Sequence, residues 1–217
     1  MSRPLIIPHE QAMIDPLKQR AFVPIPKNAS NSIIAALRAQ GWWHVHLPNP
    51  RFDVKELIVV LRDPIQRWVS GMAQFIRTTI LDPVGHNGPV FDPSQATLHD
   101  YAMTLDQFQE QYTDLVERII FDQCDRFDEH VWPQCDWLPD LPNVPRRYII
   151  MDQDFAQKTT DIFQVNLLDL NNSDDNWFLK NLQKWFRQRL LLRPELEQRI
   201  RERYQRDYDL IKQAHDH

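Results

Sequence analysis

The stretch ELIVVLRDP, residues 56–64, decides the fold class of this chain. Residues 56–61 are predicted to form a strand, because residues 57–61 are a continuous aliphatic run that favours a strand covered on both faces of a parallel sheet. Asp63 suits a helix N-cap and Pro64 the first helical position, so a helix is predicted to follow and to run to about Thr79. The stretch therefore predicts a strand followed directly by a helix.

More strands and helices are expected on both sides of this unit. Residues 21–25 and 147–151 are short apolar runs that predict two further strands. Helices are predicted over residues 32–40, 104–121, 153–163, 176–192 and 194–214, and the proline-rich residues 123–147 are expected to be loop-like. The alternation predicts an α/β fold with a central parallel sheet and a helical C-terminal tail, in which ligands bind beyond the carboxyl ends of the strands.

The length of 217 residues favours a single domain, residues 1–217. Prolines interrupt residues 1–19, which are expected to be irregular. Glycine and proline recur through residues 82–100, which predicts a long loop. Because loops beyond about 12–15 residues are usually functional or disordered, this one is a candidate lid or acceptor loop.

Composition excludes several classes of protein. No run approaches the roughly 18 apolar residues of a membrane span, and no secretory signal is evident, so a soluble cytoplasmic protein is expected. Two cysteines, Cys124 and Cys135, make neither a disulfide scaffold nor a zinc site. A net charge of -5 argues against a nucleic-acid binder. Residues 176–206 nevertheless carry nine Lys or Arg against three Glu, which indicates either a solvated helix face or a site for a small polyanion.

The first candidate site is IPKNASNS, residues 25–32, where a predicted strand turns into a helix. With only four glycines the chain lacks a Walker loop and a G-x-G-x-x-G dinucleotide loop. A helix N-terminus still binds anions through its backbone N–H groups, the small Ala29 and Ser30 allow close approach, and Lys27 adds a cation. The alternative interpretation is an ordinary turn, capped by Ser30, with a surface lysine.

The second candidate site follows the strand over residues 56–61. Arg62 stands at the strand end, where its planar fork suits a phosphate. Asp63 precedes Arg67 by four residues, so the two side chains can pair, and Ser70 lies about two turns into the helix. The alternative interpretation is a buried structural Arg–Asp pair with an interior serine.

Together the two motifs resemble the sulfotransferase family. Pro26-Lys27-x-Ala29-Ser30-x-Ser32 looks like its loop for the 5′-phosphosulfate, and Arg62-Asp63-Pro64-x-x-Arg67-x-x-Ser70 looks like its 3′-phosphate site. Residues 128–134, DEHVWPQ, and Tyr204-x-x-Asp207-Tyr208-x-Leu210 are similar to stretches of the Golgi carbohydrate sulfotransferases. The membrane anchor of that branch is missing, which suggests a soluble bacterial or viral version.

The resemblance implies a P-loop-NTPase-like three-layer fold and a donor, 3′-phosphoadenosine 5′-phosphosulfate (PAPS), that leaves as 3′-phosphoadenosine 5′-phosphate (PAP). Lys27 would contact the bridging oxygen of the leaving nucleotide. Asn28, Ala29, Ser30, Asn31 and Ser32 would line the 5′-phosphate, and Arg62 and Ser70 would hold the 3′-phosphate. No metal is needed in this scheme.

An acceptor hydroxyl needs a general base, and His130 is the candidate because imidazole exchanges protons near neutral pH. Glu129 is the rival, Asp128 is placed to orient the imidazole, and the alternative for His130 is a loop histidine bonded to backbone. Trp132 and Trp137 flank this region and either stack on a sugar or belong to the core. The pair His44 and His46 lacks a third ligand, so no metal site is predicted.

The sequence therefore predicts a sulfotransferase that moves a sulfuryl group from PAPS to a hydroxyl of a glycan or similar small acceptor. Two alternatives stay open. One is a nucleotide-binding module without turnover. The other is a small-molecule kinase of related fold, against which the missing Walker loop and the lack of an evident Mg²⁺-holding Asp both count.

Overall fold

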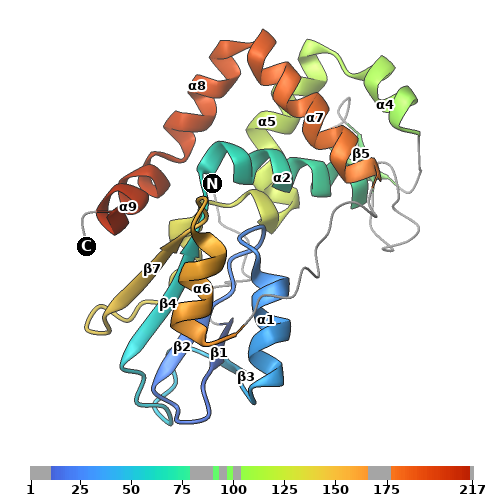
Figure 1. Ribbon diagram of the computed structural model, residues 1–217. Helices are drawn as coiled ribbons and strands as arrows, with labels where there is room; N and C mark the ends of the chain where they lie inside the picture. The colour runs from blue at the N-terminus through green and yellow to red at the C-terminus, as the bar shows by residue number, and fades with distance from the viewer. Residues whose placement is uncertain (1–10, 79–89, 93–96, 100–103, 166–176, 216–217) are drawn as a thin grey trace. The chain divides into compact units, whose positions relative to one another are not determined.

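The computed structural model describes residues 11–78, 90–92, 97–99, 104–165 and 177–215 (Figure 1). The chain forms two compact units. The sheet unit comprises Met1–Gln66, Pro133–Asn172 and Arg199–His217. The helical unit comprises Arg67–Trp132 and Ser173–Gln198. No helix in the described ranges combines the length and apolar character needed to cross a membrane.

A five-stranded sheet, in the order β3-β1-β2-β4-β7, forms the centre of the sheet unit. Its strands are β1 (Gln11–Ile14), β2 (Arg20–Val23), β3 (Trp43–His46), β4 (Glu56–Leu61) and β7 (Arg146–Ile150). β4 runs parallel to β2 on one side and to β7 on the other, whereas β1 is antiparallel to both β2 and β3. The α/β class is confirmed, but the sheet is mixed, with a parallel centre and an antiparallel edge.

Side chains of β4 alternate between two apolar layers. Leu57, Val59 and Leu61 pack on one face of the sheet, in a cluster with Trp137 and Leu210. Ile58 and Val60 pack on the other face, in a cluster that includes Ile33, Leu37 and Phe163. Burial on both faces explains why the run over residues 56–61 is apolar at nearly every position.

Helices of the sheet unit supply these two layers. α1 (Ser30–Ala39) and α6 (Phe155–Phe163) cover one face (Figure 1). α9 (Gln205–His215) and the 3-10 helix η4 (Gln134–Trp137) cover the other. Leu210 and Trp137 are the buried apolar side chains that α9 and η4 contribute to this layer.

The remaining elements belong wholly or partly to the helical unit. α2 (Pro64–Ile76) belongs to the helical unit from Arg67 onward, and α8 (Pro194–Arg203) belongs to it up to Gln198. Its other described elements, in chain order, are the antiparallel pair β5 (Val90–Asp92) and β6 (Thr97–His99), α4 (Leu105–Gln111), α5 (Asp114–Phe127), the 3-10 helix η3 (Glu129–Val131) and α7 (Trp177–Leu192).

Two predictions about irregular segments were wrong in part. β1 lies within the 1–19 stretch, where the buried Asp15 carboxylate closes the turn into β2 by accepting from the N–H groups of Gln19 (2.8 Å) and Arg20 (3.1 Å). The 82–100 stretch contains β5 and β6. The rest of that stretch, like residues 1–10, lies outside the described residues, so its role as a lid or acceptor loop stays a prediction.

Several helix bounds also differ from expectation. The helix predicted over 104–121 is two helices that meet near Tyr112, and a capping box of Thr104 and Gln107 starts the first. The helix predicted over 194–214 breaks at Tyr204, whose side chain is buried. Residues 123–147 are loop-like only in the short gaps around η3 and over residues 138–145, because α5 ends within this stretch at Phe127, η4 lies inside it and β7 begins at Arg146.

Phe163 provides a direct test of the layer that α6 forms. Its ring is buried and lies edge-on to Phe22 (5.6 Å between ring centroids) and Trp42 (5.9 Å). We expect Phe163→Ala to lower the free energy of unfolding by about 3–5 kcal/mol, because it removes a large buried side chain and leaves a cavity. Urea unfolding measures this loss, and Gln157→Ala on the exposed face of α6 is the control, with an expected change below about 0.5 kcal/mol. Equal effects of the two substitutions would contradict the packing described.

Candidate functional site

The loop after β2 has an unusual backbone. Lys27 (φ 66°) and Ala29 (φ 56°) both adopt the left-handed region, which costs a non-glycine residue about 1–3 kcal/mol and persists only where the surroundings enforce it. Helix α1 begins at Ser30, so Ala29 rather than Ser30 is the cap residue, and no side chain caps it. The first intrahelical bond runs from Ile33 N to Ala29 O (3.1 Å). The N–H groups of residues 30–32 therefore precede the helical ladder.

Lys27 and Arg62, predicted from separate motifs, lie together. Arg62 follows β4 and Lys27 follows β2, and these two strands are parallel neighbours with Val23 opposite Val59. Arg62 Nη1 donates a hydrogen bond to the carbonyl oxygen of Lys27 at 3.0 Å. Both side chains are half-buried. The two motifs thus meet at the carboxyl edge of the parallel strands, as the sequence predicts.

Asn28 does not present its amide to solvent. The residue is only 1% exposed, and its Nδ2 donates to Val60 O (2.7 Å) and to Gln134 Oε1 (2.6 Å). Its backbone N–H donates to Ile25 O at 3.3 Å. The structure therefore gives Asn28 an inward, supporting position instead of the donor-lining position predicted for it. Of the other predicted loop residues, Asn31 is exposed, Ser30 half-buried and Ser32 buried.

Two buried residues of this region were not predicted as site residues. Gln134 and Asp207 are both fully buried, and Gln134 N donates to Asp207 Oδ2 at 2.8 Å. The Gln134 side chain also bonds the backbone of Arg62 through both its oxygen and its nitrogen. Each residue stands in a stretch that the sequence singles out, yet no local pattern marks a Gln and an Asp 73 positions apart as partners.

Cys135 shares the Asp207 carboxylate. Its backbone N–H donates to Asp207 Oδ1 at 2.9 Å. Burial, followed by the nearby Asp207 carboxylate, raises the pKa of the Cys135 thiol to about 12. The thiol therefore stays protonated at neutral pH, which excludes it as a nucleophile.

His130, Glu129 and Ser70 belong to the helical unit. His130 Nδ1 lies 2.6 Å from Asp128 Oδ1, and the same oxygen accepts from the His130 N–H at 2.7 Å. An ionised carboxylate only accepts, so it holds the imidazole with its proton on Nδ1 and the lone pair on Nε2. This contact matches the predicted orienting role of Asp128. The rival base Glu129 is exposed, and Ser70 is half-buried on α2.

Gly71 sets the spacing between α2 and η3. A Cβ at this position would lie 2.6 Å from His130 O and 3.0 Å from Val131 Cγ1. The absence of a side chain therefore allows the backbone of His130 to lie against α2. Nearby, the buried Arg67 donates to Trp132 O, while Asp63 accepts from Gln66 N at 2.9 Å and so caps α2 as predicted.

The other candidates take structural positions. Trp137 is buried in the core cluster of the sheet unit. Arg38 Nη2 lies 2.8 Å from His44 Nε2, and the pKa of His44 is lowered by burial and by this guanidinium. No group of three or more His, Cys, Asp or Glu that could hold a metal occurs in the part of the chain that the structure describes.

Ion pairs engage several residues of the basic stretch over 176–206. Arg189 and Arg193 both bind the buried Glu117, and Arg193 also contacts Asp114 at 2.9 Å. Arg206 Nη1 lies 3.1 Å from Asp136 Oδ1. These contacts favour structural pairing over a polyanion site for these three arginines.

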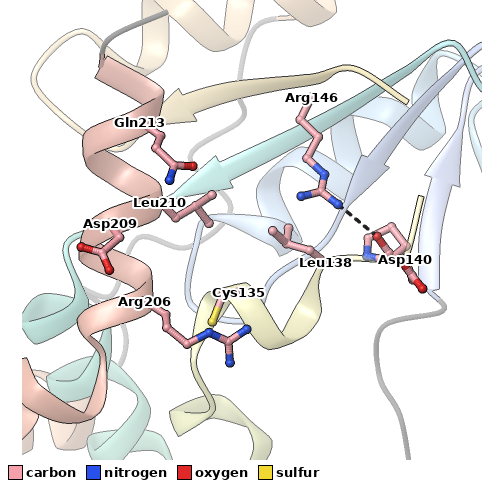
Figure 2. Close-up of a pocket in the computed structure, with 9 residues that line it drawn as sticks. Cys135, Leu138, Asp140, Arg146, Arg206, Asp209, Leu210 and Gln213 are labelled. Atoms are coloured by element: carbon pink, nitrogen blue, oxygen red, sulfur yellow. Dashed lines mark hydrogen bonds between the residues drawn. The ribbon is translucent and has the colours of Figure 1, made fainter. Parts of the chain in front are cut away.

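A surface pocket of about 390 Å³ lies on the α9 side of the sheet unit. Arg206, Asp209, Leu210 and Gln213 line it from α9, and Arg146 donates to Pro139 O at 3.3 Å on its other side (Figure 2). None of the predicted site residues lines this pocket.

Replacing Gly71 tests the close approach of α2 and η3. Gly→Ala inside a helix normally stabilises by about 1 kcal/mol. Here we expect Gly71→Ala to destabilise by about 1–3 kcal/mol, because the new methyl group overlaps the His130 carbonyl. Urea unfolding gives the sign, with Gln66→Ala on the exposed side of α2 as the control. A stabilised Gly71→Ala protein would contradict the described spacing.

Within the sheet unit, the loop that carries Lys27 lies against Arg62. Within the helical unit, Asp128 and His130 form a hydrogen-bonded pair. Comparisons of the chain with protein-family models, with curated proteins and with solved structures found no match.

Proposed function

We propose that the chain is a PAPS-dependent sulfotransferase with a P-loop-like donor site, acting on a hydroxyl of a carbohydrate or similar acceptor. One observation carries the proposal. Arg62 Nη1 donates to Lys27 O at 3.0 Å, which joins the two motifs that resemble the 3′-phosphate and 5′-phosphosulfate sites of that family. The contact lies at the carboxyl ends of β2 and β4, where open α/β sheets bind ligands.

The loop has the electrostatics that a 5′-phosphosulfate needs. The start of α1 carries about half a positive charge, and the N–H groups of residues 30–32 precede its first intrahelical bond. The left-handed Ala29 stands directly before these N–H groups, and a left-handed residue next to right-handed backbone is the geometry from which concave anion sites are built. Lys27 adds a full positive charge at the point where the leaving oxygen develops negative charge.

Arg62 suits the second phosphate, which distinguishes PAPS from ATP. A guanidinium has five N–H donors in a fixed plane, so one group bonds a carbonyl and a phosphate together. Because Arg62 is anchored on Lys27 O, its charge is held beside the loop. This arrangement favours a nucleotide that carries phosphates at both ends of the ribose over a simple diphosphate.

The transfer itself is an in-line displacement at sulfur. The acceptor oxygen forms a new bond to sulfur, the bond from sulfur to the 5′-phosphate oxygen breaks, and the hydroxyl proton passes to a base. His130 is the proposed base, supported by the 2.6 Å contact between its Nδ1 and Asp128, which leaves the Nε2 lone pair to accept a proton. Lys27 is proposed to stabilise the departing oxygen of PAP. No metal enters the scheme.

Removing Arg62 tests the 3′-phosphate assignment. We expect Arg62→Ala to weaken the binding of PAP by about 1.5–3 kcal/mol, the range for a hydrogen bond to a charged group. Calorimetric titration with PAP measures this loss, and Arg51→Ala, which removes an exposed arginine of the same unit, is the control. Equal PAP affinity of the wild type and Arg62→Ala would remove Arg62 from the proposed site.

Removing Lys27 separates turnover from binding. We expect Lys27→Ala to lower the rate of PAP release from PAPS by about 10²–10³-fold, because it deletes a group that stabilises charge only in the transition state. PAP affinity should fall much less. The assay uses a panel of mono- and oligosaccharide acceptors, with Lys55→Ala as the exposed control. Unchanged turnover of Lys27→Ala would refute the assigned role.

A further inference from the structure

Three buried side chains form a continuous polar chain inside the sheet unit. Asn28 of the loop bonds Gln134 of η4, and Gln134 bonds Asp207 of α9. Each of the three is at most 1% exposed. The contacts link positions 28, 134 and 207, which are far apart in the sequence, at the point where the two proposed donor motifs meet. Burying polar side chains costs free energy unless they form hydrogen bonds, so we asked what this cluster contributes to the donor site.

We propose that Gln134 is a positioning residue of the donor site, held by Asp207, whose side-chain amide fixes the Lys27 loop and Arg62 relative to each other. The proposal rests on the function proposed above. The Gln134 side chain is neutral. It acts through a hydrogen bond to the side chain of Asn28 in the first motif and through a hydrogen bond to the backbone of Arg62 in the second.

The bonds of the Gln134 amide fix its orientation. Oε1 accepts from Asn28 Nδ2 (2.6 Å) and from Arg62 N (2.9 Å). Nε2 donates to Arg62 O (2.9 Å) and lies 3.4 Å from Asp207 Oδ2. Rotating the amide by 180° would place a donor against Arg62 N and an acceptor against Arg62 O. Only one orientation satisfies both partners, so the side chain extends the hydrogen bonding of β4 by one residue.

Asn28 transmits this constraint to the loop. It stands between Lys27 and Ala29, the two left-handed residues. Such backbone persists only where neighbours enforce it, and the bonds from Asn28 to Val60 O and to Gln134 hold the middle of the turn inward. Without that tether, the loop loses the contact that favours its strained conformation.

Asp207 connects the C-terminal helix to the same point. Its two oxygens accept from the backbone N–H groups of Gln134 (2.8 Å) and Cys135 (2.9 Å), which fixes the start of η4. Arg206, the preceding residue, also joins this helix to η4, through Asp136 at 3.1 Å, but on the exposed side. Arg206 therefore provides a matched control: it links the same two elements through Asp136, on the exposed side, and not through Gln134 or Asn28.

The test compares Asn28→Ala, Gln134→Glu, Asp207→Asn and the control Arg206→Ala in the full chain. Hydrogen exchange without nucleotide is measured over residues 26–33, and PAP affinity is measured by calorimetry. We expect exchange over 26–33 to rise at least about tenfold, and PAP binding to weaken at least about tenfold, in the first three variants. Arg206→Ala should match the wild type in both. Asn28→Ser serves as a second loop variant if Gln134→Glu or Asp207→Asn does not fold.

Gln134→Glu adds a second readout, the pH dependence of PAP affinity, which a loss of stability alone would not change in the same way. Its new carboxylate would face the Asp207 carboxylate from α9 and Arg62 O after β4, with the Asn28 amide, the Arg62 guanidinium and the Cys135 thiol nearby. Crowding by Asp207 favours its protonated form, which donates a hydrogen bond as the native amide does. We therefore expect its PAP affinity, relative to wild type at each pH, to recover between pH 8 and pH 6.

The two proposals fail in different ways. Wild-type exchange over 26–33 and wild-type PAP affinity in Asn28→Ala and Gln134→Glu would overturn the positioning role. A wild type that does not bind PAP, together with faster exchange over 26–33 in these variants and not in Arg206→Ala, would overturn the proposed function and leave the positioning of the loop supported.

Discussion

Burial of β4 on both faces is the constraint on which the rest of the sheet unit depends. Its side chains enter one apolar layer or the other, from Leu57 through Leu61. A polar group from Leu57 through Leu61 would lie within one of these apolar layers, so at this end of the sheet polar chemistry begins after the strand ends. Arg62 is the first of these, and its guanidinium bonds Lys27 O at the end of the neighbouring parallel strand.

Polar groups at that edge are organised from inside the protein. Gln134 bonds the N–H and the carbonyl of Arg62, and the same amide holds Asn28. The charged residues proposed to meet the nucleotide are therefore fixed by neutral bonds behind them. This arrangement is typical of sites in which the groups that touch a ligand are oriented by a second layer of hydrogen bonds. It also explains how Asp207 of α9, far from residue 27 in the sequence, supports this site: its carboxylate accepts from the backbone N–H of Gln134.

The sequence predicted some parts of the sheet unit and not others, and the difference has physical reasons. The three parallel strands were predicted because each contains a run of apolar residues, and in β4 burial on both faces makes residues 57–61 apolar throughout. β1 and β3 have four residues each and no continuous apolar run as in β4, and β1 reaches its place beside β2 through the Asp15 turn. The resemblance implied that Asn28 faces the donor, and the direction of a side chain, inward here, cannot be seen in a sequence. The Gln134–Asp207 bond joins residues 73 positions apart, so no local pattern contains it.

The central claim is that this edge binds a nucleotide carrying a 3′-phosphate. Calorimetric titration of the wild-type chain with PAP, and with ADP under the same conditions, tests it most directly. We predict micromolar binding of PAP and at least about tenfold weaker binding of ADP, because ADP lacks the phosphate that Arg62 is proposed to hold. Equal affinities, or no binding of PAP by folded protein, would contradict the account.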